Sequence, residues 1–342
     1  MTVIGWDIGG VNTKAARVAN DAALAARNEP FEIQHAPSTL AARLEGIAAA
    51  LGADGSETHA ITMTAELSQF FRTKRDGVAY VLDAVEHAFP RARIVVYTVD
   101  GRFLDLREAR KTPLLVAASN WAATAGLVAT LASDAILIDV GTTTTDIIPI
   151  VAKRVAAIGH SDPERLLSGE LLYLGAVRTP VEAIAHRVPL HDGLAGVSAE
   201  SFALAGDIHV WRGDLPPEGY TAPTPDGRPT TRDFAGERIA RIVCADRELL
   251  DDSDIDRIAA FVADTMIARI AASIARVREL HPHLAVAVIA GHGAFLARAA
   301  ARRAGLRIAS DDLISAGAPR AAGAETAFAV ARLLERWLAA RP

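Results

Sequence analysis

One strand–turn–strand pattern occurs twice in this chain, in two places far apart in the sequence. Residues 4–17 read IGWDIGGVNTKAAR, and residues 137–149 read LIDVGTTTTDIIP. In register, the two copies align Asp7 with Asp139, Gly9 with Gly141, Thr13 with Thr145 and Lys14 with Asp146. Each copy reads as a strand that ends in aspartate, a turn of small residues and a second strand. Because repeated units indicate repeated structure, the chain is expected to fold as two similar lobes.

The rest of the chain alternates short β-branched runs with longer alanine- and leucine-rich runs, which is typical of α/β proteins. Strands are expected at residues 3–7, 15–18, 33–35, 60–64, 94–97, 135–139, 146–150 and 286–290. Helices are expected at residues 39–51, 77–88, 114–131, 163–172, 237–250, 253–280, 295–303 and 325–340. This order predicts an N-terminal lobe at 1–115 and a C-terminal lobe at 116–342, with a Gly-, Pro- and Asp-rich insertion at about 189–235.

The composition excludes several classes of protein. Hydrophobic residues make up 51% of the 342 residues and charged residues 23%, so the chain can bury a large core. The 36 Lys and Arg residues are scattered and the net charge is −5, which argues against a nucleic-acid or membrane partner. The single cysteine, Cys244, cannot form an internal disulfide and is expected to be buried within a helix. No secretory signal or membrane-spanning run is readable, so we expect a cytoplasmic protein, for which a homodimer stays open.

The two turns contain residue types that bind a phosphorylated ligand. Glycine lacks Cβ, so the backbone N–H groups of a glycine turn can approach an anion closely, while Asn and Thr side chains add donors. The candidate phosphate-binding residues of the two turns are Gly9, Gly10, Asn12, Thr13, Gly141, Thr142, Thr143 and Thr144. Taken singly, each turn is weak evidence, because a DxGG sequence is common and a threonine run suits an ordinary edge strand. The occurrence of both turns in matching context is more specific evidence for a phosphate-binding site than either turn alone.

Charged residues beside the turns extend this interpretation. Asp7 and Asp139 end their strands and are expected to hold Mg²⁺ directly or through water, since Mg²⁺ prefers a few carboxylates and retained waters. Lys14 adds a positive charge on one side of the first turn. Arg178 is a candidate phosphate ligand, because a guanidinium can bind a phosphate or a carboxylate with two hydrogen bonds. Asp7, Lys14 and Asp139 are therefore catalytic candidates.

Two further carboxylates are candidate general bases. Glu66 follows the expected strand 60–64, at the strand end where α/β proteins place ligands. Glu170 lies in SGELLYLGAVRTP, where a helix through Tyr173 would put Glu170 and Tyr173 on one face. The alternatives are a helix-capping carboxylate for Glu66 and an ordinary surface pair for Glu170. The ten histidines show no spacing typical of metal ligands.

These motifs resemble those of the actin, sugar-kinase and heat-shock-protein superfamily. DIGGVNTK resembles its first phosphate loop, DVGTTTTD its second, and IAGHGAF, with Gly291 and Gly293, its third loop on the adenosine side. Within the superfamily, the chain resembles the hydantoinase/oxoprolinase-related branch. Closer still, it is similar to the furan-methanamine synthases of methanofuran (methylofuran) biosynthesis and to relatives linked to tetrahydromethanopterin-dependent one-carbon metabolism. The stretches that carry this nearer resemblance are MTAELSQFFRTKRDGV, the pair Asn120 and Trp121, SGELLYLGAVRTP and RIVCAD.

The resemblance implies an actin-like (ribonuclease H-like) α/β fold with two duplicated lobes and a central cleft, in which Gly291 and Gly293 join the phosphate-binding residues. It implies a transferase that joins an aminomethylfuran-methyl diphosphate to the phenol oxygen of tyrosine or a (γ-glutamyl)tyramine-type acceptor. Pyrophosphate would be released, and Mg²⁺ is the expected cofactor. Two alternatives stay open: an ATP-dependent kinase or amidohydrolase of the same superfamily, and a nucleotide-binding switch protein without turnover. ATP is expected only in these alternatives.

Overall fold

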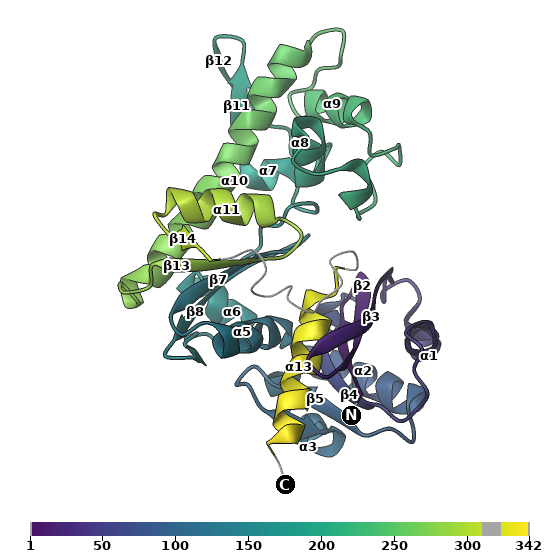
Figure 1. Cartoon of the computed structure of the whole chain (residues 1–342). Coiled ribbons are helices and arrows are strands. Elements are labelled where there is room, and N and C mark those ends of the chain that lie inside the picture. The colour runs from purple at the N-terminus through teal and green to yellow at the C-terminus, as the bar shows by residue number, and fades with distance from the viewer. Residues whose placement is uncertain (1, 310–322, 341–342) are drawn as a thin grey trace. The chain divides into compact units, whose positions relative to one another are not determined.

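The computed structural model describes residues 2–309 and 323–340, and these residues form two compact units, which are described separately (Figure 1). The first unit contains the residues up to Ala135, Pro149–Arg165 and the C-terminal helix α13 (Glu325–Ala339). It is therefore built from segments that lie at both ends of the chain.

The second unit contains Ile136–Ile148 and Leu166–Ala309. This division differs from the expected boundary between residues 115 and 116. The physical reason is that α5 (Asn120–Leu131) and α13 pack against each other within the first unit, although both were expected in the C-terminal lobe.

The first unit is built on a six-stranded sheet in the order β3-β2-β1-β4-β5-β6. β1 is antiparallel to β2 and parallel to β4, and β4 is parallel to β5. The strands are β1 (Val3–Ile8), β2 (Asn12–Ala19), β3 (Ala22–Pro30), β4 (Thr58–Met63), β5 (Ile94–Tyr97) and β6 (Phe103–Asp105). Parallel pairing places the carboxyl ends of β1 and β4 at one edge of the sheet.

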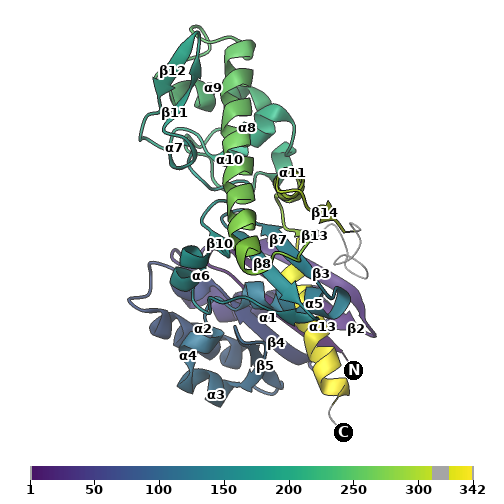
Figure 2. The ribbon, with the colours of Figure 1, turned by 90° about the vertical axis from the view of Figure 1, so that its left-hand side faces the viewer.

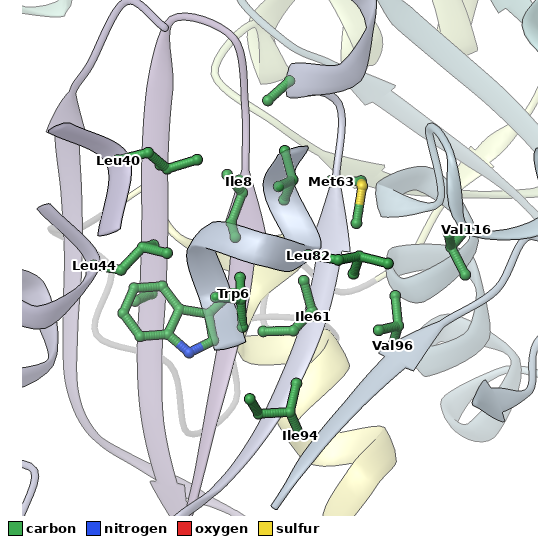
Figure 3. Packing of buried hydrophobic residues seen from close by; sticks show 14 of the residues in the cluster. Trp6, Ile8, Leu40, Leu44, Ile61, Met63, Leu82, Ile94, Val96 and Val116 are labelled. Atoms are coloured by element: carbon green, nitrogen blue, oxygen red, sulfur yellow. The ribbon is translucent and has the colours of Figure 1, made fainter. Parts of the chain in front are cut away.

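Helices cover both faces of this sheet, and the central strands β1 and β4 are consequently buried along their whole length. On one face, Trp6 and Ile8 of β1 share an apolar core with Ile61 of β4 and with Leu44 and Leu82 of the covering helices (Figure 3). On the other face, α13 packs on β1 and β4. Besides α5 and α13, the helical segments are η1 (Pro37–Thr39), α1 (Leu40–Ala50), η2 (Ala65–Leu67), α2 (Lys74–Ala88), α3 (Leu106–Lys111), α4 (Pro113–Val116) and the first part of α6 (Asp162–Ser168).

A glycine on β1 permits the close approach of α13. A Cβ atom added at Gly5 would lie 2.0 Å from the carbonyl oxygen of Ala327 and 2.9 Å from the Cβ atom of Ala331. Side chains of a strand alternate between its two faces, so Gly5 and Asp7 belong to the same face. The contact therefore fixes the distance between α13 and the strand that carries Asp7.

The second unit is built on a sheet in the order β10-β8-β7-β13-β14. The far end of β8 pairs with β9 (Arg154–Val155), and both of these segments lie within Pro149–Arg165 of the first unit. β13 is parallel to both β7 and β14. The strands are β7 (Ala135–Val140), β8 (Thr145–Val151), β10 (Leu171–Leu172), β13 (Val286–Ala290) and β14 (Arg307–Ile308). In both units a hairpin is followed by parallel strands that extend the sheet from its first strand. The duplicated, actin-like α/β fold is confirmed, and the central cleft stays a prediction.

The expected insertion at about 189–235 has secondary structure of its own and belongs to the second unit (Figure 2). Trp211 and Tyr220 within it are buried, so it packs as part of the domain. The remaining elements of this unit are α7 (Val181–Ile184), β11 (Arg187–Leu190), β12 (Gly193–Gly196), α8 (Ala205–Arg212), η3 (Pro217–Gly219), α9 (Arg232–Arg241), α10 (Asp252–Leu280) and α11 (Ala294–Arg303).

α10 is, in the described part of the chain, the one helix that is long and apolar enough to cross a membrane. One side of this helix, which includes Ile258, Val262 and Ile270, is buried, and α8, α9 and α11 pack against the helix. Figure 2 shows it as the long helix beside these elements. These contacts make α10 the central helix against which α8, α9 and α11 of the second unit pack.

Residues in turn conformations explain most of the wrong element predictions. Residues 33–35 form a turn, and the third strand is β3 instead. Because most residues of this strand are exposed, its sequence lacks the apolar pattern by which a strand is recognised. The expected helix 114–131 is interrupted between α4 and α5 at Ala118, whose φ of 50° lies in the left-handed region. The expected helix 163–172 likewise ends before Gly169, with a φ of 84°.

The expected helix 237–250 is also wrong, since α9 ends at Arg241. Cys244 follows that end with a φ of 58°, and its side chain is exposed. The expectation of a thiol buried inside a helix is therefore wrong.

Replacing Gly5 with alanine is expected to lower the free energy of unfolding by about 1–3 kcal/mol, because the new Cβ overlaps Ala327 and overpacks this contact. Urea unfolding followed by circular dichroism measures the change. Gly46→Ala is the matched control, since a Cβ on Gly46 of α1 meets no atom within 4 Å. Equal stability of the two variants would contradict the close packing of α13 on β1.

Candidate functional site

The first turn joins β1 to β2 and is closed by one backbone hydrogen bond. The N–H of Gly9 donates to the carbonyl oxygen of Asn12 at 2.9 Å. A Cβ on Gly9 would lie 2.7 Å from that oxygen, whereas the space at Gly10 is open. Thr13 is buried, and its hydroxyl has no hydrogen-bond partner among the residues that the structure describes. These four predicted phosphate ligands therefore lie on one tight hairpin.

Asp7 and Lys14 face each other across this hairpin. They are register partners, and Lys14 Nζ lies 3.3 Å from Asp7 Oδ2. Asp7 is 4% exposed, and within residues 2–309 and 323–340 its Oδ1 has no hydrogen-bond partner. Buried polar atoms normally have partners, so this oxygen suits a metal ion or a metal-bound water.

Glu66 lies on η2, directly after β4. It is 1% exposed, and neither of its carboxylate oxygens has a hydrogen-bond partner in the described part of the chain. α2 packs on its backbone, because a Cβ on Gly77 would lie 2.6 Å from Glu66 Cα. Burial raises the pKa of Glu66 from 4.5 to about 7. A carboxyl group that changes protonation near neutral pH has the property that a general base requires.

Two charged side chains act on Glu66 in opposite directions. Lys74, at the start of α2, lowers the pKa of Glu66, and Asp162, at the start of α6, raises it. The two form an ion pair with each other, with Lys74 Nζ 2.6 Å from Asp162 Oδ2. Their effects on Glu66 oppose each other, so the loss of water around the carboxyl group dominates its pKa.

The segment before α5 adds two further unusual features. Ala118 has a left-handed φ of 50°, and its backbone N–H lies near enough to Glu66 to lower the pKa of that carboxyl group slightly. The next residue, Ser119, is fully buried, and its hydroxyl has no hydrogen-bond partner among the described residues. Backbone strain and unpaired buried groups both cost stability and concentrate at functional sites. The surroundings of Glu66 are therefore a candidate site within the first unit.

The second turn repeats the geometry of the first. The N–H of Gly141 donates to the carbonyl oxygen of Thr144 at 2.8 Å, as Gly9 does to Asn12. Thr142 accepts a hydrogen bond at its carbonyl oxygen from the N–H of Arg178 at 2.9 Å. The side chain of Arg178 is half-buried and makes no ion pair with any described residue. The backbone of Arg178, the predicted phosphate ligand, is thus held beside the second turn.

The third loop packs directly on Asp139. A Cβ on Gly291, whose φ is 86°, would lie 2.2 Å from Asp139 Oδ1, so only glycine permits this contact. The N–H of Gly293 donates to the carbonyl oxygen of Val140 at 2.7 Å. Between them, His292 contacts the insertion, with its Nε2 2.7 Å from the carbonyl oxygen of Gly219. Asp139, the second turn and the third loop therefore form one group in the second unit.

Glu170 does not share a helical face with Tyr173, so that prediction is wrong. Glycine at position 169 ends α6, and the carbonyl oxygen of Glu170 accepts a hydrogen bond from the N–H of Ile147. Glu170 is 3% exposed, whereas Tyr173 is 61% exposed. The carboxylate of Glu170 already accepts a hydrogen bond from Ser168 Oγ at 3.0 Å. Glu66, with no such partner, is the better candidate base.

The donor set suits a magnesium ion more than a soft metal. No group of three or more His, Cys, Asp or Glu side chains able to hold a metal ion occurs in the described ranges. The unpartnered Oδ1 atom of Asp7 fits an ion that keeps most of its waters. The features that sequence reasoning missed are the Lys74–Asp162 ion pair and Ser119, because their partners come from distant segments.

Comparison with known proteins gives two similar enzymes that share one name, (4-{4-[2-(gamma-L-glutamylamino)ethyl]phenoxymethyl}furan-2-yl)methanamine synthase. The enzyme from Methanocaldococcus jannaschii is 38% identical over 256 residues, which are 74% of this chain and 74% of that protein. The enzyme from Methanococcus vannielii is 36% identical over 144 residues, 42% of this chain and 64% of that protein.

Among solved structures, a nucleotide-free acetone carboxylase, described in work on ATP-dependent acetone carboxylation, matches with a TM-score of 0.59. The match covers 97% of this chain and 70% of that chain at 11% identity, so it concerns the fold alone. A model of the hydantoinase/oxoprolinase family matches residues 57–333. Together with the relative that is 38% identical over 74% of the chain, this match shows that the chain belongs to the hydantoinase/oxoprolinase family.

Proposed function

We propose that this chain is a condensing transferase of methanofuran or methylofuran biosynthesis. It joins an aminomethylfuran-methyl diphosphate to the phenol oxygen of tyrosine or a (γ-glutamyl)tyramine-type acceptor. The observation that carries the proposal is the 38% identity to a synthase whose name describes a phenoxymethylfuran. That product contains an ether between a phenol oxygen and the methylene carbon on a furan ring.

The bond changes balance without an oxidant or reductant. The bond from the methylene carbon to the diphosphate oxygen breaks, and its electron pair leaves with pyrophosphate. The phenol oxygen forms the new bond to that carbon, and its proton passes to a carboxylate. Because the electron-rich furan ring is attached to the reacting carbon, positive charge can develop there before the phenol attacks.

In this proposal, the turns and loops bind the diphosphate. Their backbone N–H groups, with Lys14 and Arg178, stabilise the negative charge that grows on the leaving group, and such electrostatic stabilisation is usually a large catalytic term. The carboxylates of Asp7 and Asp139 would hold Mg²⁺ directly or through water. When bound, Mg²⁺ neutralises the charge of the diphosphate.

Glu66 is the proposed base for the phenolic proton. Its carboxyl group is buried, has no hydrogen-bond partner among the described residues and has a pKa of about 7, so both protonation states are accessible near neutral pH. Glu170 is less suited, since Ser168 already donates to it. The proposal further expects small-molecule partners only, with no nucleic acid or membrane, and a cytoplasmic location.

A mass-spectrometric endpoint assay with Mg²⁺ tests the reaction directly. The aminomethylfuran diphosphate is offered with tyrosine, tyramine or γ-glutamyltyramine, and ATP is offered in parallel. With the wild-type protein we expect an ether product and pyrophosphate. The Asp7→Asn variant should turn over more slowly, by about 10²-fold or more, with an unchanged melting temperature. ADP without any ether product would contradict the proposal and favour the ATP-using alternative. Unchanged turnover of Asp7→Asn would remove Asp7 from the site.

The Glu66→Gln variant tests the base. The rate of the wild-type protein is expected to rise with pH around a pKa of about 7, because Glu66 must be ionised to accept the proton. In Glu66→Gln, the rise of the rate with pH around 7 is expected to disappear, and the reaction is expected to be about 10²–10⁴-fold slower. A pH profile that is the same in both proteins would exclude Glu66 as the base.

The same variant has an expected effect on stability, which does not depend on the reaction. Because burial raises the folded-state pKa of Glu66 above its ordinary 4.5, the neutral carboxyl group is favoured in the folded protein. Wild-type stability should therefore fall, relative to Glu66→Gln, as pH rises from about 4.5 through about 7, by on the order of 3 kcal/mol. Urea unfolding at pH 5 and pH 8 measures this difference.

A further inference from the structure

An exposed apolar surface adjoins the buried carboxyl group of Glu66. Leu67 and Phe70 follow Glu66 in the chain and are 53% and 49% exposed. Phe70 lies edge-on to Phe71 and Tyr80, with ring centroids 5.1 Å and 6.0 Å apart. We call the surface formed by Leu67, Phe70, Phe71 and Tyr80 the aromatic shelf. Exposed aromatic clusters beside polar groups often bind ligands.

One helix, α2, contacts both the aromatic shelf and the backbone of Glu66. Gly77 of α2 contacts the backbone of Glu66, and Tyr80, three residues later on α2, contacts Phe70 and Phe71. Three residues of an α-helix rise about 4.5 Å, so the shelf lies roughly one helical turn from Glu66. The aromatic shelf and Glu66 are therefore neighbours along the same helix.

The carboxyl group of Glu66 indicates which polar group a ligand ring on the aromatic shelf would carry. The backbone N–H groups of Glu66 and Ala118 lie near the carboxyl group, but neither makes a hydrogen bond of normal geometry to it, so a ligand that donates an O–H group would satisfy it. The charged neighbours Lys74 and Asp162 are already paired with each other. A neutral donor on an aromatic ring, which is a phenol, fits this arrangement better than an anion.

We propose that the aromatic shelf binds the ring of the phenolic acceptor and that Phe70 determines specificity for it. This inference rests on the proposed function and adds the acceptor site to it. The ring packs on Phe70 and Leu67, and its hydroxyl donates to Glu66. Because the carboxylate oxygens are buried, binding includes a small shift of the segment from Leu67 to Phe70. The backbone hydrogen bonds of that segment are short-range, since the N–H groups of Leu67 and Ser68 donate to the carbonyl oxygens of Thr64 and Ala65.

Steady-state kinetics of Phe70→Ala test the shelf. We expect the KM for the acceptor to rise about tenfold, as for the loss of one aromatic contact, while the KM for the diphosphate stays unchanged. Phe261→Ala is the matched control, since Phe261 is an exposed phenylalanine of α10 in the other unit, and its kinetics should equal those of the wild type. An increase confined to the KM for the diphosphate would overturn the proposal.

A binding experiment separates this inference from the reaction. Calorimetric titration uses tyramine and phenethylamine, which differ only in the phenolic hydroxyl. We expect tyramine to bind the wild type about tenfold more tightly than phenethylamine, and this preference to shrink in Glu66→Gln, because a neutral amide oxygen is a weaker acceptor than a carboxylate. Phe70→Ala should weaken the binding of both. If Phe70→Ala does not fold, Phe70→Leu removes the aromatic face and keeps most of the volume.

The outcomes are distinguishable. Tyramine binding that depends on Phe70 and on the hydroxyl, without ether formation in the endpoint assay, would support the phenol site and refute the proposed reaction. Ether formation with unchanged acceptor KM and unchanged tyramine affinity in Phe70→Ala would support the reaction and refute the shelf. Absence of tyramine binding to the wild-type protein at millimolar concentration would refute the shelf as well.

Discussion

The contact between α13 and β1 is the constraint on which the first unit depends. The carbonyl oxygen of Ala327 occupies the space that a Cβ atom of residue 5 would fill, so the helix lies against the strand backbone. This contact covers the second face of the sheet and makes β1 a fully buried strand. Asp7, next to the last residue of this buried strand, is therefore held at a defined place, where Lys14 is its register partner. The geometry of the first turn thus follows from backbone packing.

The charged groups of the site contribute in a different way. Lys74 and Asp162 are paired with each other, whereas Glu66 is buried without a hydrogen-bond partner in the described residues. Such a carboxyl group lowers the stability of the fold when it ionises, and natural proteins retain such groups mainly where function requires them. The raised pKa of Glu66 and the strain at Ala118 are consistent with a site whose local structure is not optimised for stability.

The sequence predicts the two turns well, because a glycine turn after an aspartate-ending strand is a local pattern that occurs twice. It predicts the surroundings of Glu66 poorly, because Gly77 and Ala118 reach it through tertiary packing. The predicted helix boundaries are wrong near residues that take a left-handed conformation, as Ala118, Gly169 and Cys244 do. The prediction that α13 belongs to the C-terminal lobe is wrong, since no local pattern shows which sheet a helix covers.

The order of segments along the chain has a consequence for how the protein is made. α13 follows the whole second unit in the sequence, yet it belongs to the first unit. During synthesis, one face of the first sheet, the face that contains Gly5, therefore stays exposed to solvent while the second unit is translated and folds. A ribosome adds about 5–20 residues per second, so this apolar surface stays exposed for many seconds. The first unit is thus the last to be completed, and it is the part of the nascent chain most in need of protection from aggregation.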